Sequence, residues 1–295
     1  MHKKKVCAIF VLYNPNIPEL INNLKVVLPQ VDHAVIIDNS EKSENVNYEY
    51  CFSDFDKVQY FAFNKNRGIG AAQNKGMELA FNEGFEAVLI MDQDSHVPPN
   101  LVEELLNGAF KLKSAGYKIA CIGPIVYNRD TGETYKPLFH SKMDISDFIK
   151  KDAIISSGSL ILREAYEVIG GMEVGLFIDN VDFEWCWRAK REGYSVFVSK
   201  RIEMAHRVGE RDLSIFNLFS LQVSTPIRLY YQFRNTIILL PRAYVPRYWK
   251  IRSILIKPIE FIVFSLFIGP RSLRMKMMVK GIKHGLLKKM GEMID

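Results

Sequence analysis

The sequence has few cysteines and no cysteine motif. The four, Cys7, Cys51, Cys121 and Cys186, are far apart in a chain of 295 residues and show no C-x-x-C spacing. Three of them fall inside apolar strand or helix patterns, where a thiol behaves as a small core side chain. This distribution predicts reduced thiols in a cytosolic protein and argues against a disulfide framework or a zinc site.

Long apolar runs are also missing. The longest apolar stretch, residues 251–268, is interrupted by charged residues and a proline, so it does not read as a transmembrane helix. The lysines at the N-terminus precede an apolar run that is too short for a signal peptide and lacks a small-residue cleavage site. We therefore expect a cytoplasmic protein without a membrane span.

Two common nucleotide motifs are absent. The glycine-containing segment 64–76 is neither a Walker A loop nor a complete dinucleotide fingerprint, which disfavours an ATPase or a nicotinamide enzyme. No internal repeat or low-complexity tract is visible, and the composition is that of a globular protein.

Acidic residues are scarce in one region, the stretch from Arg242 to Lys289, although the net charge of the whole chain is only +6. Its last part predicts a helix with lysines on one side and an apolar stripe on the other: Met275, Met278, Val279, Ile282, Leu286 and Met290. A basic amphipathic helix of this kind can lie in the interface of an anionic membrane. Packing on the domain or a homodimer contact is the alternative use of the same stripe.

What the chain does contain is a series of buried strands that end on acids. Residues 34–38 end at Asp38, and the apolar run from Val88 stops at Asp92 and Asp94. Ligands of open α/β sheets bind at the carboxyl ends of the strands. If the second strand continues through Asp94, its two carboxylates point to the same side, as a divalent cation that also touches a diphosphate would need.

Between these strands lies a segment rich in small residues, residues 66–76, which predicts a helix over residues 69–82. Small residues let the backbone approach a ligand, and the amino end of the helix can face a phosphate or a base. A glycine-rich helix packed closely on a strand explains the same pattern without a ligand.

A second acidic cluster opens a later helix, with Asp179, Asp182 and Glu184 among the aromatic residues Phe177, Trp185 and Trp187. Acids in the first turn of a helix favourably meet its dipole. Their density among aromatic side chains also suits a general base whose pKa is raised by burial, beside rings that stack on sugars.

Taken in order, these motifs resemble the inverting nucleotide-sugar glycosyltransferases of family 2, and within them the bacterial rhamnosyltransferase-like branch. The resemblance runs from Val6 to about Gly209. It implies the GT-A fold, an α/β fold with a Rossmann-like nucleotide-binding half and a mixed central sheet covered by helices on both faces. We expect this domain over residues 1–212 and a helical, basic amphipathic extension over residues 213–295.

The resemblance also implies roles for individual residues. The donor-binding set is Asp38, Asn66, Arg67, Gly68, Asn74, Asp92 and Asp94, and the metal set is Asp94, His206 and Asp92 with Mg²⁺ or Mn²⁺. Ser157, Gly158, Trp185 and Trp187 would lie on the acceptor side. Asp182 would be the catalytic base, with Glu184 beside it and Asp179 in reserve, because Val181-Asp182 stands where the family usually has Glu-Asp.

The implied reaction is transfer of a single sugar, since the Q-x-x-R-W motif of processive synthases is absent from the sequence. Within this branch the donor would be dTDP-L-rhamnose and the acceptor a lipid-linked glycan of a cell-surface polysaccharide such as O-antigen. The enzyme would then be peripheral on the inner face of the cell membrane. A UDP-hexose donor, a sugar nucleotidyltransferase, and a non-catalytic basic adaptor for membrane or nucleic acid are the alternatives; the glycosyltransferase reading has no nucleic-acid partner.

Overall fold

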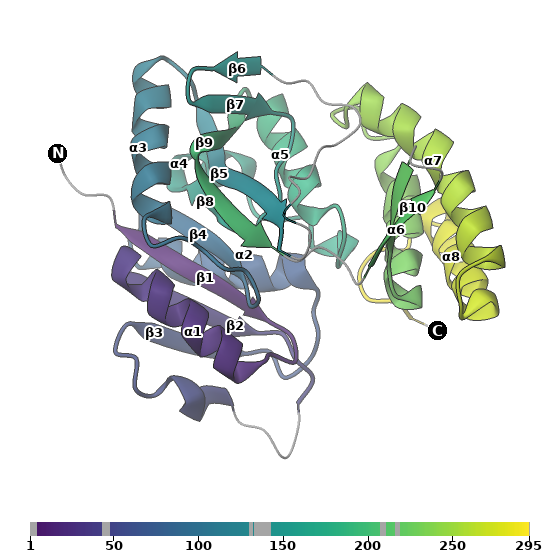
Figure 1. Ribbon diagram of the computed structural model, residues 1–295, viewed down its shortest axis with the longest axis horizontal. Helices are drawn as coiled ribbons and strands as arrows, with labels where there is room; N and C mark the ends of the chain where they lie inside the picture. The colour runs from purple at the N-terminus through teal and green to yellow at the C-terminus, as the bar shows by residue number, and fades with distance from the viewer. Residues whose placement is uncertain are drawn as a thin grey trace. The chain divides into compact units, whose positions relative to one another are not determined.

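The computed structural model describes residues 5–42, 48–129, 132, 143–206, 211–215 and 219–294. The chain divides into two compact units, the first made of Met1–Glu173 and Asp182–Arg207, the second of Val174–Val181 and Val208–Asp295 (Figure 1). The division near residue 207 lies close to the predicted boundary after residue 212. The transfer of residues 174–181 to the second unit was not predicted.

Among the described residues, the first unit is built on a nine-stranded mixed sheet with the order β3-β2-β1-β4-β8-β5-β9-β7-β6. The strands are β1 (Val6–Leu12), β2 (His33–Asp38), β3 (Val58–Ala62), β4 (Ala87–Asp92), β5 (Ile119–Asn128), β6 (Met143–Ile145), β7 (Phe148–Lys151), β8 (Ser159–Leu162) and β9 (Ser195–His206). The first four pair in parallel, and β8 runs antiparallel between β4 and β5. The predicted α/β class with a mixed central sheet is confirmed.

Helices cover both faces of this sheet. Helices α1 (Ile17–Val27) and α3 (Leu101–Ser114) bury their apolar stripes on one face, together with alternate residues of β1, β2 and β4. Helix α2 (Ile69–Asn82) packs on the opposite face, where a side chain at Gly76 would lie 2.3 Å from Ile9. The remaining elements of this part are α4 (Arg163–Ile169), α5 (Val181–Arg191) and the short 3-10 helices η1 (Leu28–Gln30), η2 (Tyr48–Phe52) and η3 (Val174–Leu176).

Two strands differ from the prediction. The apolar pattern of residues 153–162 predicts a strand through Ser156 and Gly158. In the structure these residues form a turn, and β8 begins only at Ser159, because the positive φ of 74° at Gly158 breaks the extended chain. The polar stretch 127–151 has little periodicity and predicts an irregular surface excursion. In the structure its last part, residues 143–151, forms the hairpin of β6 and β7. Strand β6 pairs with β7, and β7 pairs with β9, a pairing between distant residues that the local sequence pattern does not reveal.

The second unit contains the strand pair β10 (Arg211–Ile215) and β11 (Phe219–Val223) and the helices α6 (Pro226–Leu239), α7 (Arg247–Leu266) and α8 (Arg271–Leu286). Leu229, Phe233, Phe264 and Met278 form its buried cluster. In the described part of the chain, none of the helices has both the length and the hydropathy of a membrane span.

The predicted apolar stripe of the last helix is partly buried inside the second unit and partly exposed to solvent. Met278 is fully buried and Ile282 packs on the buried cluster, whereas Met275, Val279 and Leu286 are exposed. Helix α8 lies very close to α6, since a side chain at Gly281 would come within 2.4 Å of the Tyr230 carbonyl oxygen. Packing inside the unit explains Met278 and Ile282 without a membrane.

Candidate active site

The acids predicted for the donor lie at one edge of the sheet. In the parallel pairing, Leu12 of β1 is opposite Asp38 of β2, and Val11 is opposite Asp92 of β4. The two acids therefore flank the carboxyl end of β1, separated by two strand spacings, or about 10 Å. This edge is where α/β sheets bind their ligands, as the sequence predicts.

Asp38 is held in place by its neighbours. Its buried carboxylate accepts hydrogen bonds from the Tyr60 hydroxyl at 2.6 Å and from the Ser40 backbone N–H at 2.9 Å. Burial, and then this hydrogen bond to Asp38, raise the pKa of Tyr60 well above its ordinary value, so the phenol keeps its proton and remains a donor. The end of β2 is thereby rigid.

Asparagines connect the β2 end to the start of α2. The Asn39 side chain donates to the side-chain oxygen of Asn66 at 3.0 Å and accepts from the Arg67 N–H at 2.7 Å. The Asn66 oxygen also accepts from the Gly68 N–H at 2.9 Å, and Gly68 has a φ of 82° that favours glycine. Arg67 is exposed with its guanidinium 5.0 Å from the Phe63 ring centre. These residues form the predicted approach to the amino end of α2.

Asn74, the next predicted donor residue, is used within the fold. Its side chain donates to the Met172 carbonyl at 3.0 Å and accepts from the Met172 N–H at 2.6 Å. This pair of bonds ties α2 to the chain that follows α4. The geometry favours a structural role for Asn74 and leaves its amide occupied on both sides.

The loop after β4 is anchored at two points. The strand ends at Asp92, so Asp94 lies in a turn and strand alternation does not orient it. The Gln93 side chain turns away to the Tyr13 backbone, accepting from its N–H at 2.8 Å and donating to its carbonyl at 3.2 Å. Farther along, the His96 N–H donates to the Ala205 carbonyl at 3.2 Å, forming an isolated antiparallel bridge.

The bridge between His96 and Ala205 involves two neighbours of the predicted metal ligands Asp94 and His206. It brings the loop containing Asp94 beside the end of β9, whose last residue is His206. The side chain of His206 and residue Gly209 lie outside the described residues. Among the side chains that are described, no group of three or more His, Cys, Asp or Glu residues could hold a metal ion.

A tight turn joins the two acidic clusters. The Ser157 hydroxyl accepts from the Asp92 N–H at 3.3 Å and lies 2.7 Å from the Ser95 hydroxyl. The preceding residue, Ser156, donates its backbone N–H to the Asp182 carboxylate at 3.3 Å. Gly158 closes the turn by donating to the Ile90 carbonyl at 2.8 Å. The predicted acceptor-side residues Ser157 and Gly158 thus bond the end of β4 and its loop, and the preceding Ser156 bonds the predicted base.

Asp182, the predicted base, has a raised pKa. Burial raises the pKa of its carboxyl from the ordinary 3.8 to about 6, against the opposing effect of the Phe183 and Ser156 N–H groups, and the negative charge of Asp92 adds to the rise. A pKa close to the working pH is what proton abstraction requires. Taken as a whole residue, Asp182 is half-buried.

Glu184, Trp185 and Trp187, which follow Asp182 in α5, are buried. The fully buried Glu184 carboxylate receives two bonds from the Arg188 Nε, at 2.8 and 2.9 Å. Trp185 and Trp187 are each 1% exposed, and the Trp185 Nε1–H donates to the Gly170 carbonyl. This geometry favours structural roles for all three and counts against the acceptor contacts predicted for the two tryptophans, because their rings have no accessible face.

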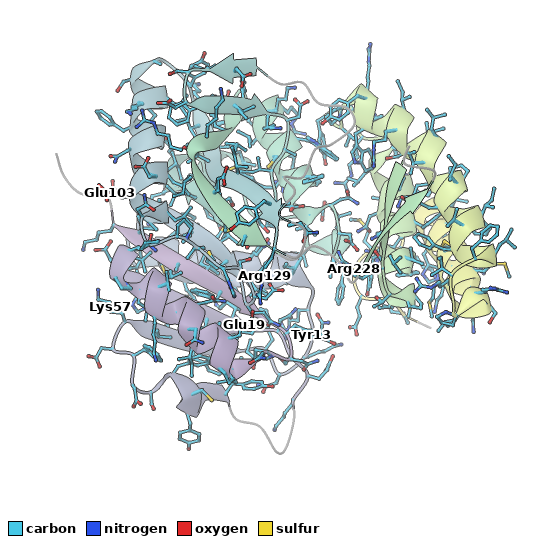
Figure 2. The ribbon with its side chains drawn as sticks, in the orientation of Figure 1. Tyr13, Glu19, Lys57, Glu103, Arg129 and Arg228 are labelled. Carbon is cyan, nitrogen blue, oxygen red and sulfur yellow. The ribbon has the colours of Figure 1, made fainter. Side chains whose placement is uncertain are left out.

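Asp179 belongs to the second unit and is paired there. Its carboxylate receives two bonds from the Arg228 guanidinium, at 2.5 and 3.3 Å, from the first turn of α6 (Figure 2). Phe177, Asp179 and Asn180 all have positive φ values, between 63° and 65°. Such backbone is costly outside glycine and persists only where its surroundings hold it.

Two side chains of helix α6, Asn235 and Tyr231, contact the segment that has these positive φ values. The Asn235 side chain lies within hydrogen-bond distance of the carbonyls of Leu176, Ile178 and Asp179, at 2.8–3.0 Å. Tyr231 stacks on Phe177 with ring centres 4.9 Å apart. Both α6 residues were missed in the sequence, where an Asn and a Tyr in an apolar helix carry no signal of a partner more than fifty residues away.

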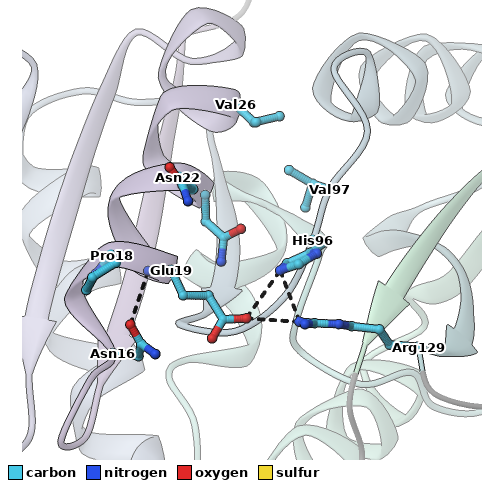
Figure 3. A pocket seen from close by; sticks show the side chains of 9 residues that line it. Asn16, Pro18, Glu19, Asn22, Val26, His96, Val97 and Arg129 are labelled. Carbon is cyan, nitrogen blue, oxygen red and sulfur yellow. Dashed lines mark hydrogen bonds and ion pairs between the residues drawn. The ribbon is translucent and has the colours of Figure 1, made fainter.

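A pocket of about 650 Å³ lies between α1 and the loop after β4 (Figure 3). Its polar wall is formed by Glu19, which accepts from Arg129 at 2.9 Å and lies 3.3 Å from the His96 Nε2. The Arg129 hydrogen bond lowers the pKa of Glu19, so the Glu19 carboxyl is ionised at neutral pH. None of the predicted donor, acceptor or metal residues lines it.

The chain is similar in sequence to known glycosyltransferases. Residues 7–170 match the profile described as Glycosyl transferase family 2, which covers more than half of the chain and includes the donor edge. The chain belongs to glycosyl transferase family 2. This glycosyltransferase is 31% identical to the dTDP-rhamnosyl transferase RfbF of Shigella flexneri, over 84% of each chain. It is also 25% identical to the low-salt glycan biosynthesis hexosyltransferase Agl10 of Haloferax volcanii, over 66% of each.

Solved structures agree on the fold. The S. aureus TarS 1-349 complex with UDP-GlcNAc superposes with a TM-score of 0.58 at 14% identity, over 97% of this glycosyltransferase and 81% of that chain. GalNAc-T7 with UDP, GalNAc and Mn²⁺ has the same TM-score at 15% identity, and this chain spans only 56% of its length. These neighbours are GT-A glycosyltransferases, and the predicted GT-A fold is confirmed.

Proposed function

We propose that this glycosyltransferase transfers a single L-rhamnose from dTDP-L-rhamnose, with inversion, to a lipid-linked glycan of a cell-surface polysaccharide. The observation that carries the proposal is the pairing of a donor edge with a base of raised pKa, Asp182, through the Ser156-Ser157 turn. The similarity to a dTDP-rhamnosyl transferase over most of both chains supports the choice of donor.

In this mechanism Asp182 accepts the proton of the acceptor hydroxyl as its oxygen attacks the anomeric carbon. The bond from that carbon to the diphosphate oxygen breaks, and the nucleoside diphosphate leaves from the opposite face, so the configuration inverts. A base with a pKa of about 6 is largely ionised at neutral pH and is regenerated when its proton passes to solvent. Asp38 and the Asn39–Asn66 pair would hold the nucleoside.

A divalent cation, Mg²⁺ or Mn²⁺, fits the donor set near the diphosphate. Asp92 at the end of β4 and Asp94 in the loop after it offer oxygen ligands, and the His96–Ala205 bridge brings that loop to the strand that ends at His206. Oxygen ligands of this kind suit a hard cation. The cation would supply positive charge to the leaving diphosphate. A solved relative with Mn²⁺ supports its inclusion.

The acceptor proposal places the enzyme on the inner face of the cell membrane, where lipid-linked glycans are extended. The scarcity of acids after residue 241 supports a peripheral contact with anionic lipid. A homodimer through the same helices is the competing use of that region.

The second candidate function is a UDP-hexose-dependent transferase, which the relatives solved with UDP and UDP-GlcNAc favour. Membership of family 2 speaks against nucleotidyl transfer and against a non-catalytic adaptor. The deciding experiment supplies dTDP-L-rhamnose, UDP-glucose or UDP-GlcNAc with Mn²⁺ or Mg²⁺ and measures release of nucleoside diphosphate. We expect turnover with dTDP-L-rhamnose; turnover confined to a UDP-sugar would overturn the donor, and release of pyrophosphate would overturn glycosyl transfer.

A further inference from the structure

Helix α7 turns an apolar face toward solvent. The face consists of Ile251, Ile254, Leu255, Ile259, Ile262 and Leu266. Their spacing of three and four residues places them on one side of the helix, and each is 42–62% exposed. The opposite side carries Trp249, Ser253 and Phe264, which are buried inside the second unit, to which α7 belongs. We call the six exposed residues the α7 apolar face.

This arrangement is the reverse of a water-facing surface helix, which shows polar residues to solvent. A contiguous exposed apolar patch marks a surface that is covered by something else. Helix α8 does not cover it, because α8 packs on α6 and on the buried side of α7 through Met278 and Phe264 (Figure 1).

The charges around the face are positive. Arg247 and Arg252 are exposed in the first turns of α7, and Arg271 is exposed at the start of α8. Glu260 is the only acidic residue in the sequence between 242 and 291, and it lies in a contact with Lys257 on the less exposed side of the helix. The chemistry is therefore apolar in the centre and cationic at the ends.

We infer that the α7 apolar face is the surface by which this protein binds an anionic lipid bilayer, with α7 lying flat in the interface. A helix of 20 residues is about 30 Å long, and in this orientation its aliphatic side chains enter the acyl boundary while the arginines meet lipid phosphates. The inference gives the proposed membrane association a defined surface; it does not depend on the donor sugar or on catalysis.

Charge also argues against a second copy of the chain as the occupant. In a two-fold contact through α7, the same surface meets itself, so the basic ends and flanks of the helices approach each other without acidic partners. Like charges facing each other across an interface are unfavourable. An anionic membrane satisfies both the apolar and the cationic parts of the face.

The test is vesicle sedimentation of the full chain, with phosphatidylcholine vesicles containing either no phosphatidylglycerol or about 30 mol %. We expect binding to the anionic vesicles, weakened by salt, and a loss of about tenfold or more for Ile262→Glu or Leu255→Glu. Val168→Glu on α4 is the matched control, because Val168 is 56% exposed, Ile262 is 54% exposed, and the change in net charge is the same. The control should bind like the wild type.

Three results would overturn the inference: no binding of the wild type to anionic vesicles, equal binding of Ile262→Glu and wild type, or a solution dimer that Ile262→Glu dissociates while vesicle binding persists. Release of nucleoside diphosphate from the donor in detergent-free solution is measured in parallel and should be unchanged in these variants. Loss of vesicle binding with intact turnover separates this inference from the proposed function, whose failure would appear as absent turnover in the wild type.

Discussion

The backbone N–H of Ser156 donates to the carboxylate of Asp182 at 3.3 Å, while the hydroxyl of the next residue, Ser157, accepts from the Asp92 N–H at the same distance. Adjacent residues of one turn therefore fix both the predicted base and the end of the donor strand. Ser156 is itself anchored, because its hydroxyl accepts from the buried Gln73 side chain at 3.0 Å. The turn sets the spacing between the two acids, and the charge of one raises the pKa of the other.

The first prediction concerns the pH dependence of transfer. Since the pKa of Asp182 is about 6, kcat/KM for the donor–acceptor pair should rise about tenfold per pH unit below that value and level off above it. Asp182→Asn should lower kcat by about 10²–10⁴-fold and leave donor affinity unchanged. Asp179→Asn is the comparison. If Asp179→Asn abolished transfer and Asp182→Asn did not, the base assignment would move to Asp179.

The second prediction concerns stability at the same residue. Because the pKa of Asp182 is higher in the folded chain than its ordinary 3.8, folding favours the protonated carboxyl. That contribution is fully present below 3.8 and is lost as the pH rises through about 6. Asp182→Asn should therefore stabilise the protein at pH 7 by roughly 1–2 kcal/mol and have little effect at pH 3.5. Urea unfolding at both pH values checks this; a destabilised variant at pH 7 would contradict it.

Much of this site is local in sequence, and that part was predictable. Helix α2 begins at Ile69 and ends at Asn82, as expected from the glycine before it and the apolar spacing within it. The acids at the ends of β2 and β4 follow directly from apolar runs that stop on a carboxylate. Parallel pairing then brings Asp38 and Asp92 to one edge, because both strands run in the same direction beside β1.

What was not predictable depends on contacts between distant parts of the chain. Asn74 lies in a motif that suggests a ligand, but its amide binds the backbone of Met172, 98 residues away. Trp185 and Trp187 could stack on a sugar only if α5 turned that side outward, and in the structure both side chains are buried. Residue type alone does not show which face of a short helix is covered.

The third prediction separates structure from catalysis at Glu184. Its fully buried carboxylate is paired with Arg188, whose guanidinium also donates to the carbonyls of Ile169 and Gly171. Removing one charge of such a pair leaves the other uncompensated, so Glu184→Gln should lower the free energy of unfolding by about 3–5 kcal/mol. Denaturant unfolding measures the loss. Glu184→Gln with Arg188→Met should recover part of it, and a stable but inactive Glu184→Gln would instead indicate a catalytic role.

The fourth prediction assigns donor binding to the loop after β4. Asp94→Ala should raise the Kd for the nucleotide sugar in the presence of Mn²⁺ by about tenfold or more, and should change the Kd little when the metal is chelated. Isothermal titration with and without EDTA measures the difference. Asp54→Ala, at an exposed acid outside the site, is the control. An equal loss with and without metal would show that Asp94 contacts the donor directly.

The last prediction concerns the segment that leads into the base. Phe177, Asp179 and Asn180 hold positive φ values immediately before α5, and Asn235 bonds three carbonyls of that segment. Without these bonds the segment can relax toward ordinary backbone angles. The first residues of α5, which include Asp182, would then no longer be held in one position. Asn235→Ala should therefore lower kcat by about tenfold or more. It should leave the donor Kd unchanged, because the hydrogen bonds of Asn235 do not involve the donor loop.

The matched control is Gln232→Ala, one turn earlier on α6, whose side chain donates to the Ser224 hydroxyl at 3.0 Å. Both variants should lose about 1–3 kcal/mol of stability, since each removes buried or half-buried hydrogen bonds. Only Asn235→Ala should lose kcat, and its pH profile should keep the midpoint near 6 because the surroundings of the Asp182 carboxyl are unchanged. If both variants lost kcat in proportion to stability, Asn235 would stabilise the fold without positioning the base.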